Sequence, residues 1–472
     1  MYLIPDWFES ERVRETMKEV NSKQNMLTGK PGRTLFFFAV PMILGNLFQQ
    51  FYNMADSVIV GRYVGENALA AVGASYSLTT VFIMVAIGGG IGASVLTSQY
   101  LGAKEYGKMK TSIYTALITF FIISIVLAIG GFLGNRFILQ ALKTPDNILN
   151  DAVLYLSIYF CGLPFLFMYN VLSAMFNALG KSRIPLYLLI FSSVLNVVLD
   201  LYMVRVLHLE VAGVAIATVI AQGLSALLAF WILLMQLKKY NHTPRETDAD
   251  KVKLYDTEML VQGTKIAIPS IVQQSIVSIG MLLVQSVVNG FGSSVLAGYS
   301  AGMRIESICI VPMIATGNAV STFTAQNLGA KQSERVKQGY RAGVCMVGVF
   351  AVIICVILQL FHNGIMQFFL EGEGGQKALE TGNAYLMFIG WFFALIGVKA
   401  VTDGVLRGSG DVNVYMMANL VNLGIRVLFA NLCAPVFGVA AVWWAVPIGW
   451  GVNFLISFIR YKSGKWSRKK VI

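Results

Sequence analysis

The chain is built from two related halves, because short motifs of the first half recur 227 or 228 residues later. Ala39-Val40-Pro41 returns as Ala267-Ile268-Pro269, and Gln99-Tyr-Leu-Gly-Ala-Lys104 returns as Gln326-Asn-Leu-Gly-Ala-Lys331. Such a constant spacing is not expected from chance similarity between apolar segments. The repeat therefore predicts two homologous bundles with the same fold.

The composition places these bundles in a membrane. Hydrophobic residues make up 56% of the chain and charged residues 13%, and the mean hydropathy is +0.67. Soluble domains carry about 25% charged residues, so the surface of a soluble protein could not cover a core this apolar. Residues 1–30 are polar and contain no apolar run, so we expect no cleavable signal peptide. The five cysteines lie in apolar segments without a CxxC spacing, which favours core packing over metal binding or disulfides.

Twelve apolar runs are long enough to cross a bilayer, which takes about 20 helical residues. Six runs lie in each half, and prolines inside several of them are tolerated in membrane helices. The predicted spans are 35–60, 68–97, 112–134, 152–175, 185–206, 211–236, 263–290, 295–323, 338–361, 381–405, 412–434 and 438–459.

The distribution of Lys and Arg predicts the orientation of the spans. Of the 36 basic residues, 28 lie on the side of the N-terminus, 5 on the opposite side and 3 within spans. Basic residues favour the cytoplasmic side, so we expect a cell-membrane protein with both termini in the cytoplasm. Because these residues cluster in short loops and tails, the net charge of +12 does not indicate nucleic-acid binding.

An even number of spans makes both halves begin on the same side of the membrane, so the repeat is parallel. The predicted fold is an all-α integral membrane protein with two six-helix lobes, related by a pseudo-two-fold axis along the membrane normal. The predicted segments are a cytoplasmic N-terminal segment, an N-lobe, a cytoplasmic linker, a C-lobe and a basic cytoplasmic tail, at 1–33, 34–237, 238–262, 263–460 and 461–472. Residues 371–380 are predicted to face outward.

Ionisable residues inside membrane spans are costly and are therefore functional candidates. Asp56 lies near the outer end of the first span, and Asp200 lies one turn after Asn196 on the fifth, so the latter two share a helix face. With Thr218 on the sixth span, these residues offer two carboxylates, an amide oxygen and a hydroxyl. Such donors suit Na⁺, or a proton shared between the acids. The alternative is that the acids lie at solvated helix ends and cap or pair locally.

The second half does not repeat this set of ligands. Its matching positions are Val284, Asn422, Arg426 and Val446. Both acids are lost and one is replaced by a cation. This asymmetry predicts that the cation chemistry belongs to the first half.

Two further pairs of charged residues lie in the second half. Lys399 and Asp403 are one turn apart on the tenth span, and we expect an internal ion pair, with a gating or substrate role as the alternative. Arg304 and Glu306 lie near the start of the eighth span and cannot face each other on a helix. They are interpreted as groups at a helix end, with a functional role as the alternative.

Four glutamines recur at a similar depth in the two halves. They are Gln49, Gln50, Gln273 and Gln274. Amides at this depth either line a cavity for substrate and gating or bridge neighbouring helices.

Nothing in the sequence indicates an enzyme or a cofactor. It contains no Walker lysine motif, nucleotide fingerprint or catalytic triad signature, so ATP-driven pumping by this chain is not expected. His208, His242 and His362 have no metal-binding spacing among themselves. The 30 Phe and 20 Met are explained by packing and lipid contact, and a subset lining a cleft would suit flat organic cations.

The sequence resembles the multidrug and toxic compound extrusion (MATE) family of the larger MOP flippase superfamily over about residues 27–460. The resemblance depends on Leu27-Thr-Gly29, Pro41, Asn53-Met-Ala-Asp-Ser-Val-Ile-Val-Gly61, the paired Leu-Gly-Ala-Lys loops, Asn196-x-x-x-Asp200 and Gly408-Ser-Gly-Asp411. It implies a twelve-helix antiporter with a two-lobed cleft that exports organic cations in exchange for H⁺ or Na⁺.

The resemblance also implies roles for individual residues. Asp56, Asn196, Asp200 and Thr218 would form the cation site of the first lobe, and Pro41 would lie at a bend of the first helix. Some branches of the family carry a second-lobe acid on the seventh span. None occurs here between Ile266 and Gly290, which argues against a second-lobe ion site.

Other classes of protein fit less well. A lipid-linked oligosaccharide flippase of the same superfamily is the main alternative, but its cleft should be basic, and the first lobe here is acidic. A channel would need polar pore-lining repeats around an axis, and these are not evident. We therefore expect a monomeric transporter whose partners are organic cations and membrane lipids.

Overall fold

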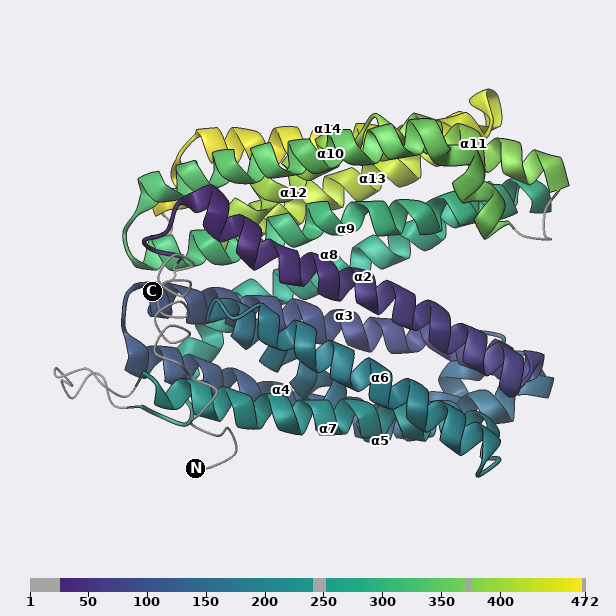
Figure 1. Cartoon of the computed structure of the whole chain (residues 1–472), viewed down its shortest axis with the longest axis horizontal. Coiled ribbons are helices and arrows are strands. Elements are labelled where there is room, and N and C mark those ends of the chain that lie inside the picture. Colours follow the sequence, from purple (N-terminus) through teal and green to yellow (C-terminus); the bar gives the residue numbers. More distant parts are fainter. Residues whose placement is uncertain (1–25, 241–251, 371–374, 469–472) are drawn as a thin grey trace, which may run out of the picture.

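The computed structural model describes residues 26–240, 252–370 and 375–468, and the described residues are helical and contain no strand (Figure 1). The first half consists of six helices: α2 (Pro31–Tyr63), α3 (Glu66–Gly102), α4 (Tyr106–Ala141), α5 (Asp146–Ala178), α6 (Arg183–Arg205) and α7 (Glu210–Lys238). The second half consists of α8 (Thr257–Asn289), α9 (Ser293–Gly329), α10 (Ser333–Phe369), α11 (Gly375–Gly390), α12 (Phe393–Gly408), α13 (Val412–Phe437) and α14 (Val439–Lys462), followed by the short helix η3 (Lys465–Arg468). The predicted cytoplasmic segments extend beyond the described residues at 1–25, 241–251 and 469–472, as does part of the outward loop at 371–374.

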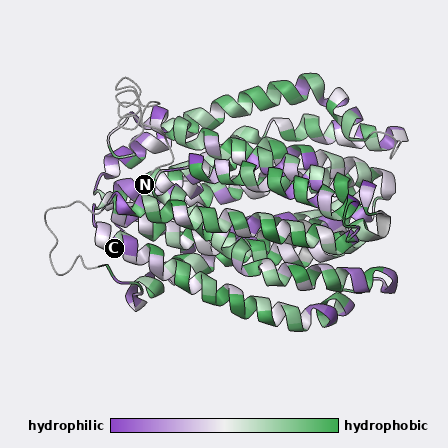
Figure 2. Ribbon diagram, turned by 60° about the horizontal axis from the view of Figure 1, so that its bottom comes forward, coloured by the Kyte–Doolittle hydropathy of each residue, from purple (hydrophilic) through white to green (hydrophobic). Residues whose placement is uncertain are grey.

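Eleven predicted spans each correspond to one helix and the tenth corresponds to the α11–α12 pair, which confirms the twelve-span, two-lobed fold. Among the described residues, ten helices are long and apolar enough to cross a membrane, and the α11–α12 pair makes eleven. The seventh span is the 33-residue helix α8. Hydrophobic residues cover the flanks of both bundles, and hydrophilic residues gather towards the ends of the helices (Figure 2). The chain is therefore an integral membrane protein.

The tenth span differs from the prediction of one continuous helix over 381–405. It is broken between Gly390 and Phe393, where α11 and α12 meet at 54°. The backbone N–H groups of Trp391 and Phe392 bond to carbonyls three residues earlier, so the last turn tightens and the α-helical ladder stops. No proline marks the break. Gly390, a weak helix former, lies at the end of α11 against Leu358 of α10.

The first helix of each half crosses to the opposite bundle. α2 packs against α6 of its own half but also against α9 and α10, and α8 packs against α13 of its own half but also against α3 and α4. Figure 1 shows α2 beginning beside the second-half helices and ending beside the first-half helices. Leu35 and Phe38 of α2 are accordingly buried in the hydrophobic core of the second bundle. The N-terminal half of α2 thus packs within the C-lobe.

Candidate functional site

The fold brings Asp56, Asn196, Asp200 and Thr218 together within the N-lobe, on α2, α6 and α7. Asp200 is 0% exposed and Asn196 is 2% exposed. With its amide oriented so that both ends are satisfied, Asn196 donates to Asp200 Oδ2 at 3.1 Å and accepts from the backbone N–H of Thr218 at 3.1 Å. The Oη atom of Tyr52 lies 2.5 Å from the same amide. Asn196 therefore holds α2, α6 and α7 around one polar centre.

The two acids face each other across this centre. Asp56 and Asp200 lie close enough to interact electrostatically. Two neighbouring carboxylates resist ionising together, so a proton or a cation between them would be stabilised. The Oδ1 atoms of both residues are buried and have no hydrogen-bond partner. These unsatisfied acceptors fit a shared proton or a hard cation, which favour carboxylate oxygens.

A narrow cavity of about 60 Å³ is bounded by Asn196 and Thr218 of this centre, whereas Asp56 and Asp200 are not among its lining residues. It is lined by Gln49, Tyr52, Tyr169, Leu189, Ser192, Ser193, Asn196, Thr218, Ala221 and Gln222. A water takes about 30 Å³ of liquid volume, so the cavity can hold water or an ion but no drug molecule. Gln49 lines this cavity and donates to Asn53 Oδ1 at 2.9 Å, whereas Gln50 is not among the lining residues.

The glutamines of the second half contact neighbouring helices. Gln273 is buried and accepts a hydrogen bond from Tyr415 of α13 at 3.0 Å. The Nε2 atom of Gln274 lies 3.9 Å from Met84 Sδ of α3. These contacts match the helix-bridging alternative for Gln273 and Gln274.

Lys399 and Asp403 form the internal ion pair expected from their spacing on α12. The Nζ atom of Lys399 lies 3.0 Å from Asp403 Oδ2 and donates to Asn419 at 3.2 Å. Ser457 donates to the other oxygen of Asp403 at 2.6 Å. Both charges are thus paired and hydrogen-bonded within the C-lobe, as buried charges in a membrane require.

The interpretation of Glu306 as a group at a helix end is wrong. It lies 13 residues after Ser293, the first residue of the 37-residue helix α9, and is 5% exposed. Its neighbour Arg304 is exposed on another face of the helix. The signal in the sequence was the spacing from Tyr299 and Gly302, which places Glu306 on the buried face of α9 at i+7 and i+4.

The paired Leu-Gly-Ala-Lys motifs join the ends of the two lobes that lie on the side predicted to be cytoplasmic. Gln99 of α3 donates to the carbonyl of Gly408 in the C-lobe at 3.2 Å, and Gln326 of α9 donates to the carbonyl of Ala178 in the N-lobe at 2.7 Å. Gly102 packs on the carbonyl of Gln326, and Gly329 packs on the carbonyl of Gln99. This pseudo-symmetric set, called here the clasp, closes the lobes against each other.

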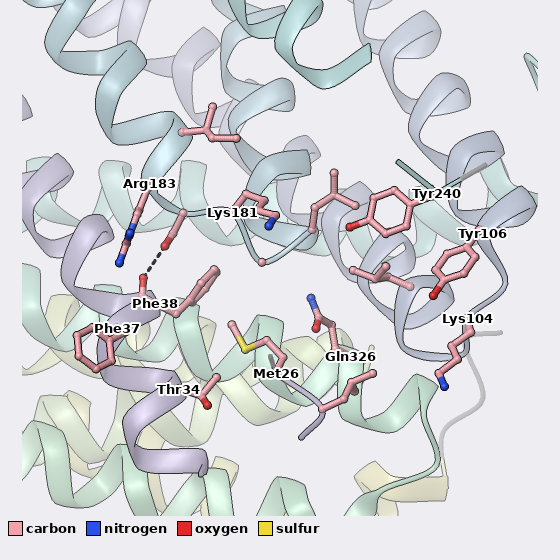
Figure 3. A pocket seen from close by; sticks show the side chains of 16 residues that line it. Met26, Thr34, Phe37, Phe38, Lys104, Tyr106, Lys181, Arg183, Tyr240 and Gln326 are labelled. Carbon is pink, nitrogen blue, oxygen red and sulfur yellow. Dashed lines mark hydrogen bonds between the residues drawn. The ribbon is translucent and has the colours of Figure 1, made fainter. Parts of the chain in front are cut away.

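A cavity of about 470 Å³ lies beside the clasp (Figure 3). Gln326 reaches into it, together with the basic side chains of Lys104, Lys181 and Arg183. Burial and the nearby Lys239 lower the pKa of Lys181. A cavity with this positive lining repels organic cations, so it is distinct from the acidic centre of the N-lobe. No group of three or more His, Cys, Asp or Glu that could hold a metal occurs within the described residues.

Known proteins with similar sequences and folds are membrane transporters. The MatE family model matches residues 41–202 and again 269–432, once in each half of the repeat. The chain is similar to the probable multidrug resistance protein YoeA of Bacillus subtilis, with 30% identity over 97% of this chain and 99% of that protein. It is 29% identical to the probable multidrug resistance protein YpnP of the same organism, over 93% and 96% of the two chains. A crystal structure of MATE in complex with MaL6 has the same fold, with a TM-score of 0.85 at 21% identity over 94% of this chain and 99% of that one.

Proposed function

Because the chain belongs to the MatE family of membrane transporters that carry out multidrug efflux, we propose that it is a secondary antiporter that exports organic cations or amphipathic drugs in exchange for H⁺ or Na⁺. The observation that carries this proposal is the buried pair of Asp56 and Asp200 with its unsatisfied oxygens. An exchanger needs a group that binds the coupling ion and releases it on the other side. Carboxyl groups inside a membrane span perform this task in pumps and transporters.

In the proposed cycle, the coupling ion binds to Asp56, Asn196, Asp200 and Thr218. Binding of the ion and binding of a drug between the lobes are mutually exclusive. The clasp is closed when the ion is taken up from outside, and it opens to admit drug from the cytoplasm. The electrostatic interaction of the two carboxyl groups supports H⁺ as one coupling ion, because neighbouring carboxylates resist ionising together and one proton relieves their repulsion. The oxygen donors of Asn196 and Thr218 support Na⁺ at the same place. We propose that H⁺ and Na⁺ compete for this site. We further propose that the protein acts as a monomer and needs no cofactor.

Reconstitution of the purified protein in liposomes tests this function. Vesicles with an interior more acidic than the medium, or richer in Na⁺, should accumulate ethidium against its gradient as the ion leaves. Liposomes without protein, and proteoliposomes whose gradient is collapsed by an ionophore, should not. If neither gradient drives accumulation, the antiport assignment fails.

The proposed orientation in the cell membrane, with both termini in the cytoplasm, is tested by labelling. The outward loop and the linker offer exposed positions at Lys377 and Leu254. In a cysteine-free background, Lys377→Cys should react with an impermeant maleimide in intact cells, and Leu254→Cys should react only after permeabilisation. The reverse pattern would invert the topology.

A further inference from the structure

The C-lobe contains a second buried polar centre, formed by Glu306 of α9, Tyr385 of α11 and Arg426 of α13. Tyr385 donates a hydrogen bond to Glu306 Oε2. Glu306 and Arg426 are 5% and 9% exposed, and Tyr385 is fully buried. The ring of Tyr385 is itself packed against Tyr299 at 5.3 Å and Trp443 at 5.8 Å between centroids. The carboxyl group is thus enclosed by aromatic rings and bound by one hydroxyl.

The repeat relates this centre to the acids of the N-lobe. Arg426 and Asn422 occupy the positions that match Asp200 and Asn196. The larger Arg side chain is accommodated because α14 carries Gly449 beside it, where an added Cβ would lie 2.9 Å from Arg426 Cγ. Glu306 supplies the acid from a different helix. The C-lobe therefore has a charged centre at the position that matches the acidic centre of the N-lobe, but its acid and its cation come from different helices.

Arg426 and Glu306 interact without forming an ion pair. Arg426 acts electrostatically on Glu306, yet no ion pair between these two residues is found among the described residues. The Nε atom of Arg426 is buried and has no hydrogen-bond partner, and neither has Oδ1 of Asn422. A purely structural pair would be expected to close this gap, as Lys399 and Asp403 do at 3.0 Å. The open arrangement leaves Glu306 free to change its protonation state.

The groups around Glu306 select the ion that it can carry. Those interacting with it are Tyr299 and Cys309 of α9, Tyr385 of α11 and Arg426 of α13. Lys399 and Asp403 of α12 are paired with each other. A metal cation needs several oxygen ligands, whereas this centre offers one carboxyl group beside a fixed positive charge. A proton needs only one carboxylate oxygen.

We propose that Glu306 is a second proton-carrying carboxyl group of the transport cycle, with Arg426 as its fixed counter-charge. The step is the reversible binding of one proton to the Glu306 carboxylate. In the ionised state the Glu306 carboxylate faces Arg426 and accepts a hydrogen bond from the Tyr385 hydroxyl. In the protonated state Arg426 loses its counter-charge, so the packing of α13 against its neighbours changes. This inference rests on the proposed antiport, to which it adds one proton per cycle in the C-lobe.

Infrared spectroscopy tests the proton site without depending on transport. A pH titration of purified wild-type protein should show the C=O band of a buried protonated carboxyl group that is absent in Glu306→Gln and retained in Asp200→Asn. Glu306→Asp should restore a band, and Glu380→Gln, the same change at an exposed acid of α11, should leave the spectrum unchanged. If Glu306→Gln does not fold, Tyr385→Phe keeps the carboxyl group but removes its hydrogen bond, and the band should then shift in frequency. A spectrum unchanged in both variants overturns the proposal.

The same variant in proteoliposomes separates this inference from the proposed function. Glu306→Gln should still accumulate ethidium, but the steady-state accumulation should rise less steeply with the imposed pH difference, because one proton fewer is exchanged per drug. An unchanged steepness refutes a coupled proton at Glu306. Failure of the wild type to respond to any gradient would instead refute the antiport function, and the infrared band would still decide whether Glu306 binds a proton.

Discussion

Replacing Asp200 with asparagine should abolish gradient-driven export while the protein remains folded. Asparagine has nearly the same shape and can still bond to Asn196, but it cannot exchange an ion. The Oδ1 atom of Asp200 is buried without a hydrogen-bond partner, and in the variant it no longer belongs to an ionisable group that can bind the coupling ion. Ethidium accumulation in proteoliposomes should therefore fall to the level measured without a gradient.

The matched control is Asp146→Asn, the same change at an exposed acid in the first turn of α5. It should transport at the wild-type rate. Both proteins should elute as one monodisperse peak, which excludes misfolding as the cause of any loss. Wild-type accumulation by Asp200→Asn would remove the N-lobe acids from the coupling mechanism.

Introducing valine at Gly329 should open the cytoplasmic side of the transporter. A Cβ atom there would overlap the backbone carbonyl of Gln99 in the opposite lobe, and a backbone group cannot rotate away. Overpacking of this kind costs about 1–3 kcal/mol, which corresponds to a population shift of roughly 5- to 150-fold. The closed clasp should therefore become a minor state. Transport should fall because the ion is no longer taken up from a closed-clasp conformation.

Spin labels at exposed cytoplasmic positions of the two lobes, Lys239 and Lys337, report this change as a longer distance between the lobes. Gly348→Val of α10 is the control, because a Cβ atom there meets nothing within 4 Å. It should give the wild-type distance distribution. An unchanged distribution in Gly329→Val would mean that the clasp does not hold the lobes together.

The sequence predicted the number and order of the spans because hydropathy and length define a membrane span. It could not predict the break in the tenth span, since Gly390, Trp391 and Phe392 are as apolar as their surroundings and the bend depends on packing against α10. It also could not place α2. The residues that bury Leu35 and Phe38 lie in the other half of the chain, and no local pattern encodes that contact.

The N-lobe acids could be grouped in advance because acids in an apolar span are rare and Asn196 and Asp200 share a helix face. Their mutual contact required the structure, since Asp56 comes from a helix distant in sequence. Glu306 was misplaced because a nearby Arg304 suggested a solvated helix end. The spacing from Tyr299 and Gly302 indicates its buried face, but its hydrogen-bond partner Tyr385 is 79 positions away and no spacing rule connects the two.

The exchange of first helices between the lobes has a consequence for how such a chain can be divided. A half chain ending in the linker would leave Leu35 and Phe38 without the core that buries them, and α3 and α4 without α8. Two identical copies of such a half could satisfy both contacts by trading their first helices. The architecture of the full chain thus resembles a domain-swapped homodimer whose two subunits are joined into one polypeptide. The two halves should be obtainable as separate polypeptides only when they are produced together.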